Sequence, residues 1–167
     1  LAPGDLSPAH VMIRVNEALY GNIHRGMFIT MLYLVVNREN RQMRIASAGH
    51  LPLFHWSART GEHQKIDPPG PALAIRSPDK FTAAISETVV ALEPGDLLAL
   101  TTDGVTEAFN RQREQFGDER LILYFIEKAR LAAEEIKEGL VKALSSFAEG
   151  AEQSDDITLV LLKVKET

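Results

Sequence analysis

The first residues of the chain show the apolar spacing of a helix. Ser7 followed by Pro8 is a typical helix start, and Gly21 is a typical stop. Between them, apolar side chains recur at helical spacing, at Val11, Met12, Val15 and Leu19. The pattern therefore predicts an amphipathic helix between Ser7 and Gly21.

Extended patterns follow this helix. Residues 27–36 and 41–49 are rich in aliphatic and β-branched side chains and flank a polar Asn-Arg-Glu-Asn segment, which predicts an antiparallel hairpin with a tight turn. A short strand is predicted at 51–56, followed by a turn around Gly61. Residues 67–75 contain too many prolines for a central strand, so we expect a loop over a surface.

The second half of the chain begins with strand patterns. Residues 80–92 alternate well enough to predict a strand, and residues 93–96, Glu-Pro-Gly-Asp, predict a turn. Residues 97–102 are short and apolar on both faces, which is typical of a central strand. This strand leads directly into Asp103.

Helical spacing returns between residues 118 and 150, where no proline interrupts the pattern. We expect two helices with a break near 131–133, or a single bent helix. The chain then closes with a predicted strand at 157–164. Because the strands come in runs, with helices at the start and near the end, the order favours an α+β fold with layered sheets covered by helices.

Composition narrows the classes of function. The 167 residues suit one domain, and 45% hydrophobic with 25% charged residues is ordinary for a globular protein. The net charge of −5, with scattered Lys and Arg, argues against nucleic acid as a partner. No apolar run approaches the roughly 20 residues of a membrane span. The chain has no cysteine, so we expect a cytoplasmic protein whose metal ligands, where present, are oxygen or imidazole.

Acidic residues stand at the ends of two predicted strands. Asp103 follows the strand at 97–102, and Asp155 with Asp156 precede the last strand. If these strands are antiparallel neighbours, Asp103 and Asp155 meet, and a hard divalent ion such as Mg²⁺ or Mn²⁺ would relieve their repulsion. The alternative is structural, since Asp before Gly is a common turn pair and Asp before a strand is a common cap.

Four segments in register, at 47–56, 92–110, 115–121 and 154–162, resemble the sigma-regulatory branch of the metal-dependent protein phosphatases. This is the type 2C superfamily, which includes the stage II sporulation protein E group. The resemblance implies a β-sandwich flanked by helices with a site for two Mg²⁺ or Mn²⁺ ions. It also implies hydrolysis of phosphoserine or phosphothreonine on a partner protein.

The resemblance assigns roles to individual residues. Asp103 and Asp155 match the metal-binding acids of the family, whose ions activate water for in-line attack on phosphorus. Asp156 stands where the family often has Asp or Asn, so we expect it to support the metal site through a hydrogen bond rather than by direct ligation. Gly104 is expected to permit a turn close to the metals. Glu107 has two open readings, a place beside the site or a solvated helix start.

His50 agrees with the family pattern, whereas the first residues of the chain depart from it. His50 matches the family motif at a turn, where substrate contact is the alternative to a structural role. The family's other metal-binding acid and its Asp-x-x-Gly-His-Gly motif have no match, since Pro3-Gly4-Asp5 opens a helix instead of closing a hairpin. We therefore expect residues 1–167 to be the larger C-terminal part of a phosphatase domain, truncated at its N-terminus, with weak metal affinity.

Three hypotheses follow. The first is a serine/threonine phosphatase of bacterial signalling that acts on a phosphorylated anti-sigma-factor antagonist and follows a sensor or receiver domain. The second is a catalytically inactive module that keeps the phosphatase fold and binds a partner protein. The third is a fragment whose exposed sheet edge pairs with another copy to give a homodimer.

Overall fold

Helix α1 (Pro8–Leu19) opens the computed structural model, which describes residues 7–24, 26–153 and 155–165. Ser7 caps α1 as expected, because its side chain accepts a hydrogen bond from the His10 amide at 3.3 Å. Pro3–Asp5 and Ser154, which the sequence motifs include, lie outside the described residues. Two compact units make up the structure, one from the residues up to Pro52 with Asp67–Leu92, the other from Leu53–Ile66 with the residues from Glu93 onward.

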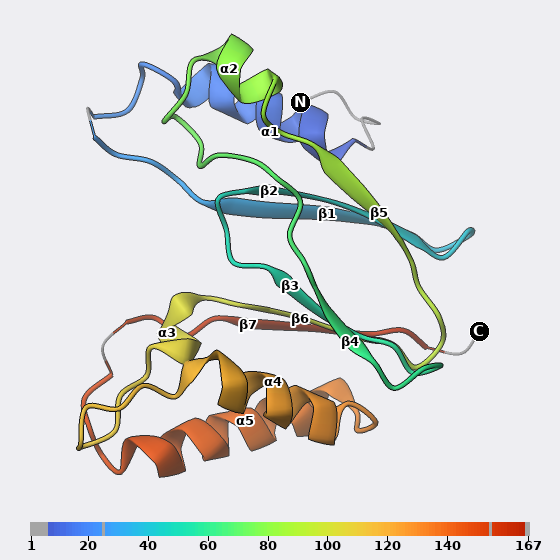
Figure 1. The fold of residues 1–167 in the computed structure, drawn as a ribbon, viewed down its shortest axis with the longest axis vertical. Coiled ribbons are helices and arrows are strands. Elements are labelled where there is room, and N and C mark those ends of the chain that lie inside the picture. The colour runs from blue at the N-terminus through green and yellow to red at the C-terminus, as the bar shows by residue number, and fades with distance from the viewer. Residues whose placement is uncertain (1–6, 25, 154, 166–167) are drawn as a thin grey trace. The chain divides into compact units, whose positions relative to one another are not determined.

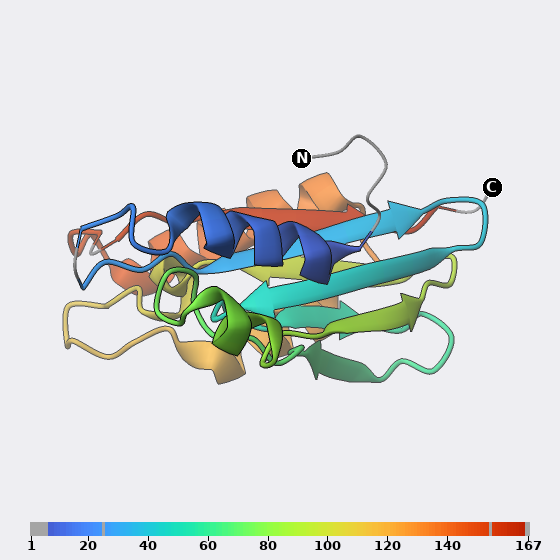
Figure 2. The same ribbon diagram turned by 90° about the horizontal axis from the view of Figure 1, so that it is seen from above.

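The first unit contains a three-stranded antiparallel sheet in the order β1-β2-β5. Its strands are β1 (Met31–Asn37), β2 (Gln42–Ala48) and β5 (Glu87–Ala91). The predicted hairpin is thus confirmed, with Met31 opposite Ala48 and Asn37 opposite Gln42. Helices α1 and α2 (Pro78–Thr82) lie side by side over this sheet (Figure 1, Figure 2). They bury a small core of Met12, Ala46, Ala48, Leu73 and Phe81.

The strand predicted at 80–92 is wrong in its first half. Helix α2 occupies Pro78–Thr82, and only Glu87–Ala91 pairs as a strand. Ser77 and Pro78 form a helix start, and Phe81 is fully buried against α1 and β2 residues, so tertiary packing overrides the local alternation. The proline-rich segment before it is a loop as expected, joined to Ile29 by an isolated bridge at Leu73.

Glu87 ties three elements of the first unit together. Its Oε2 accepts hydrogen bonds from the Ser7 hydroxyl at 2.8 Å and the Ala9 amide at 3.4 Å, and Arg44 Nε donates to its Oε1 at 2.9 Å. Burial raises the pKa of Glu87, but the hydrogen bonds from Arg44, Ser7 and Ala9 together outweigh it and hold the pKa below 4.5. The ionised carboxylate therefore joins β5 to β2 and to the start of α1.

The second unit contains a four-stranded antiparallel sheet in the order β4-β3-β6-β7. Its strands are β3 (Leu53–Trp56), β4 (His63–Ile66), β6 (Leu97–Thr101) and β7 (Leu159–Lys163). Helices α4 (Gly117–Lys128) and α5 (Ala133–Ala148) cover one face of it, after the short helix α3 (Asp103–Thr106) (Figure 1). Two separate helices with a break between Lys128 and Ala133 confirm the first of the two helical alternatives.

Strand β4 was not predicted from the sequence. The segment after Gly61 was expected to be part of a turn, yet His63–Ile66 pairs with β3. Only Ile66 of this strand is buried, so no hydrophobic period marks it. The α+β class with antiparallel sheets and covering helices is confirmed, whereas the single domain stays a prediction.

A buried acid anchors the start of β6. Asp96 is 1% exposed and accepts hydrogen bonds from the amides of Ala58 at 2.9 Å and Glu93 at 3.0 Å. His55, 5% exposed on β3, donates from Nε2 to the same carboxylate at 3.0 Å, because Gln64 donates to its Nδ1. The network joins β3, β4 and the turn before β6, so it fixes where β6 begins.

We expect Asp96→Ala to lower the free energy of unfolding by about 3 kcal/mol, because it leaves His55 and two amides buried without their acceptor. Urea denaturation measures this. The control is Asp118→Ala, which removes an exposed ion pair with Lys65 and should cost at most about 1 kcal/mol. Equal losses in the two variants would contradict the role given to Asp96.

The lowered pKa of Glu87 predicts a pH dependence of stability. Its contribution is fully present above the unfolded value near 4.5 and is lost as the pH falls through the lower folded pKa. Glu87→Gln should therefore destabilise the protein at neutral pH and flatten the decline of the melting temperature in acid. Glu17→Gln, at an exposed position on α1, should leave the slope unchanged. A parallel decline in wild type and Glu87→Gln would refute the assignment.

Candidate functional site

The pairing of β6 with β7 decides where the acidic residues lie. These strands are antiparallel neighbours, with Leu97 opposite Lys163 and Thr101 opposite Leu159. The end of β6 therefore coincides with the start of β7. Asp103 comes just after β6, and Asp155 and Asp156 come just before β7, so the three acids share one end of the sheet.

Thr102 extends this pairing beyond the last ladder residues. Its amide donates to the Thr158 carbonyl at 3.2 Å, and its hydroxyl donates to the Asp156 carbonyl at 2.9 Å. The same hydroxyl accepts from the Thr158 amide at 2.9 Å. The backbone that carries Asp103 is thus held directly against the backbone that carries Asp156. Sequence reasoning missed Thr102, whose only signal is a hydroxyl residue directly before Asp-Gly.

Gly104 lies where this backbone approach is closest. A Cβ at this position would stand 2.4 Å from the Asp156 carbonyl oxygen and 3.3 Å from that of Asp155. Both contacts are with backbone atoms, which have little freedom to move aside. A glycine is therefore required for the first turn of α3 to pack beside Asp155 and Asp156.

The carboxylates themselves are exposed, and among the residues that the structure describes they are bonded only to the next amide in the sequence. Asp103 Oδ1 accepts from the Gly104 amide at 3.1 Å, and Asp155 Oδ1 accepts from the Asp156 amide at 2.7 Å. Most of their lone pairs remain open to solvent or to a ligand. Carboxylate oxygens are the donor type that Mg²⁺ and Mn²⁺ prefer.

The number of donors is smaller than a two-ion centre needs. Within residues 7–24, 26–153 and 155–165, no three or more His, Asp or Glu side chains converge in an arrangement that would hold a metal. The fit is therefore partial: the chemistry of Asp103 and Asp155 suits a hard cation, and water or phosphate would have to complete its shell.

The other two candidate residues are placed differently. Glu107 is exposed at the end of α3, and its amide donates to the Asp103 carbonyl at 2.7 Å, which leaves it one helical turn from Asp103. His50 belongs to the first unit, where its amide donates to the Ser47 hydroxyl at 3.3 Å. The turn expected at His50 agrees with this bond, while contact of His50 with a substrate stays a prediction.

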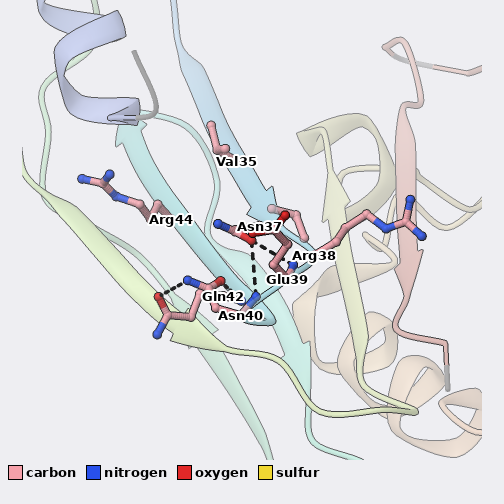
Figure 3. A pocket seen from close by; sticks show the side chains of 8 residues that line it. Val35, Asn37, Arg38, Glu39, Asn40, Gln42 and Arg44 are labelled. Atoms are coloured by element: carbon pink, nitrogen blue, oxygen red, sulfur yellow. Dashed lines mark hydrogen bonds between the residues drawn. The ribbon is translucent and has the colours of Figure 1, made fainter. Parts of the chain in front are cut away.

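A hollow of about 590 Å³ lies at the turn between β1 and β2, and the side chains that line it are drawn in Figure 3. Asn37 accepts there from the amides of Glu39 and Asn40, and Asn40 donates to Gln42. These polar groups serve the turn itself. Glu39 is the single carboxylate among the eight described residues that line it, so the hollow lacks the paired acids of the β6–β7 end.

Comparison with known proteins adds to this geometry. The sequence model of the family "Stage II sporulation protein E (SpoIIE)" matches residues 1–165. Phosphoserine phosphatase RsbU of Bacillus subtilis is 29% identical over 96% of this chain and 46% of its own length. The chain therefore spans less than half of that relative.

Two solved structures share the fold. The SiaA-PP2C domain of Pseudomonas aeruginosa has a TM-score of 0.79 at 22% identity, over 97% of this chain and 63% of that one. The phosphatase domain of the cell fate determinant SpoIIE from Bacillus subtilis, presoaked with Mn, has a TM-score of 0.57 at 14% identity, over 100% and 76%. At these identities, the likeness establishes the fold.

We expect Gly104→Ala to destabilise the protein by about 2 kcal/mol, because its Cβ forces the Asp156 carbonyl away and strains the pairing at Thr102. Hydrogen exchange of the Thr158 amide should quicken in the same variant. Gly61→Ala is the control: its positive φ costs about 1 kcal/mol without any close contact. Unchanged exchange at Thr158 would show that the backbone tolerates the methyl group.

Proposed function

Because the chain belongs to the stage II sporulation protein E family, we propose that it forms part of a Mg²⁺- or Mn²⁺-dependent protein serine/threonine phosphatase. The observation that carries the proposal is that the segments of Asp103 and of Asp155 and Asp156 lie against each other at one end of the β6–β7 pair. The name of RsbU, a phosphoserine phosphatase, supports the same chemistry.

In this proposal Asp103 and Asp155 hold the cation through carboxylate oxygens. A bound Mg²⁺ or Mn²⁺ would lower the pKa of the water that it binds and would neutralise charge on the phosphoryl oxygens of the substrate. Asp156 supports the metal site through hydrogen bonds. Glu107 lies just after the end of α3, one helical turn from Asp103. Thr102 and Gly104 keep the two acidic segments in contact, so that the ligand atoms need little rearrangement when the cation binds.

A second candidate function is a phosphatase-like module that binds a partner without turnover. The observation that favours it is the partial donor set, since the described residues bring together no group of three or more metal-binding side chains. Turnover separates this candidate from the first, since an inactive module would release no phosphate in the presence of Mn²⁺. If another segment or chain supplied a further acid, the metal site would again fit the first candidate function, the active phosphatase.

The proposed substrate is a phosphorylated anti-sigma-factor antagonist, and the proposed input is an upstream sensor or receiver domain. The name of RsbU supports a phosphoserine substrate, and the more than half of its length outside the match is compatible with a further domain in such proteins. None of the helices that the structure describes combines the length and apolar character needed to cross a bilayer. The proposal keeps a cytoplasmic location, because a chain without cysteine needs no oxidising compartment.

A homodimer is the remaining part of the proposal. Strand β1 stands at the edge of one sheet and β7 at the edge of the other, and each offers backbone groups on its open side. Pairing of such an edge with a second copy would satisfy these groups.

We expect Asp103→Asn and Asp155→Asn each to lower Mn²⁺-dependent hydrolysis of an aryl phosphate and of a phosphoserine peptide by roughly 100-fold or more. Both should also abolish the rise in melting temperature that Mn²⁺ produces, because the ion loses a charged ligand. Asp118→Asn, an exposed acid on α4, is the matched control and should behave as wild type.

One result would count against this assignment, and a second measurement tests the dimer. A wild-type protein with neither hydrolysis nor a Mn²⁺-dependent rise in melting temperature would favour the inactive module. Light scattering of the same preparation tests the dimer, which a clean monomer at high concentration would refute.

A further inference from the structure

A second hollow lies in the unit that carries the acids. It has a volume of about 410 Å³, within the range of pockets that hold small ligands. We call it the α3–α5 pocket, because Gly104 of α3 and Val141, Leu144 and Ala148 of α5 line it. Ile157, in the segment that leads to β7, closes another side. The sequence pattern gave no sign of it.

The lining is mainly apolar and partly open to water. Val141 is 58% exposed and Ile157 is 39% exposed, although both are large hydrophobic residues. Single exposed hydrophobic residues are ordinary, but these two converge on one hollow together with Phe109. Glu152 is the single charged residue among the described residues that line the pocket. This chemistry favours an apolar occupant and disfavours an acidic one.

The pocket adjoins the segments that carry the acids, through Gly104. Gly104 forms part of its wall, follows Asp103 directly, and packs on the Asp155 and Asp156 carbonyls. An extended chain advances about 3.3–3.6 Å per residue. A phosphoserine held at the acids would therefore bring a residue from the next few positions of the same peptide to the pocket.

We propose that the α3–α5 pocket binds an apolar side chain of the phosphoprotein substrate, within about three residues of the phosphoserine. This inference rests on the proposed phosphatase function and adds a determinant of substrate choice to it. Because the contact is made before and during hydrolysis alike, it should act mainly on KM. Burying additional methylene groups in such a pocket changes specificity by roughly 10-fold or more.

The test uses the full-length protein with Mn²⁺ and a set of phosphoserine peptides. Each peptide carries Leu or Ala at one of the three positions on either side of phosphoserine, and an aryl phosphate serves as a substrate with no flanking residues. We expect the Leu peptide to have a KM roughly 10-fold below that of its Ala partner at one position. The ratio of the KM values for the Leu and Ala peptides is taken within one protein variant, so a general change in the activity of that variant cancels.

Two variants and one matched control locate the effect. Val141→Asp places a charge at the pocket wall, and Ser145→Phe fills the pocket from an exposed position; both should remove the preference for Leu. Leu123→Asp is the control, since Leu123 lies on α4 and is also 58% exposed. It should keep the preference and the activity of wild type.

The possible results distinguish a failure of the pocket proposal from a failure of the phosphatase proposal. Loss of the preference in both pocket variants but not in Leu123→Asp supports the pocket. Equal KM values for all Leu and Ala pairs, or a preference that survives both pocket variants, with the aryl phosphate still hydrolysed, overturn the pocket and leave the phosphatase proposal standing. No hydrolysis of any substrate overturns both.

Discussion

The arrangement of the second unit depends on the antiparallel ladder between β6 and β7. This ladder fixes which strand ends coincide, so it alone determines that Asp103 faces the segment of Asp155 and Asp156. At the opposite end of the ladder, Lys163 donates to the carbonyls of Gly95 at 2.6 Å and Ala129 at 2.7 Å. Lys163 is partly buried there, and this burial lowers the pKa of its amino group. The ladder is held at both ends, so its register cannot shift without breaking these bonds.

The structural elements predicted correctly from the sequence were those marked by local patterns of apolar residues. The β1–β2 hairpin, the paired helices α4 and α5, and the central strand β6 all carry a clear local pattern of apolar residues, periodic in the helices and continuous in β6, bounded by turn or helix signals. The coincidence of the acidic strand ends was predicted on the condition that the two strands are antiparallel neighbours, and the pairing of β6 with β7 meets this condition. What the sequence predicted at this site was therefore a consequence of strand direction.

The features that were missed depend on contacts distant in sequence. Helix α2 is stabilised by the burial of Phe81, and β4 by pairing with β3, and neither leaves a local period. The His55–Asp96 bond joins residues 41 positions apart, so no motif contains both. The α3–α5 pocket arises in the same way, from the packing of helix surfaces that each look ordinary alone.

The two kinds of aspartate in this unit differ in how far their oxygens are already hydrogen-bonded, which bears on the proposal that Asp103 and Asp155 bind a cation. Asp96 is buried and accepts from His55 and two backbone amides, so its oxygens are committed to the protein. Asp103 and Asp155 are exposed, and within the described chain each carboxylate accepts one amide from its neighbour in sequence. A cation binds where oxygens are close together but not yet satisfied, because it then displaces water rather than existing hydrogen bonds. The exposure of Asp103 and Asp155 also limits their affinity for a cation, because solvent screens the charges of the two carboxylates. Tight binding at this end of the sheet thus requires a further acid or the phosphate of a bound substrate.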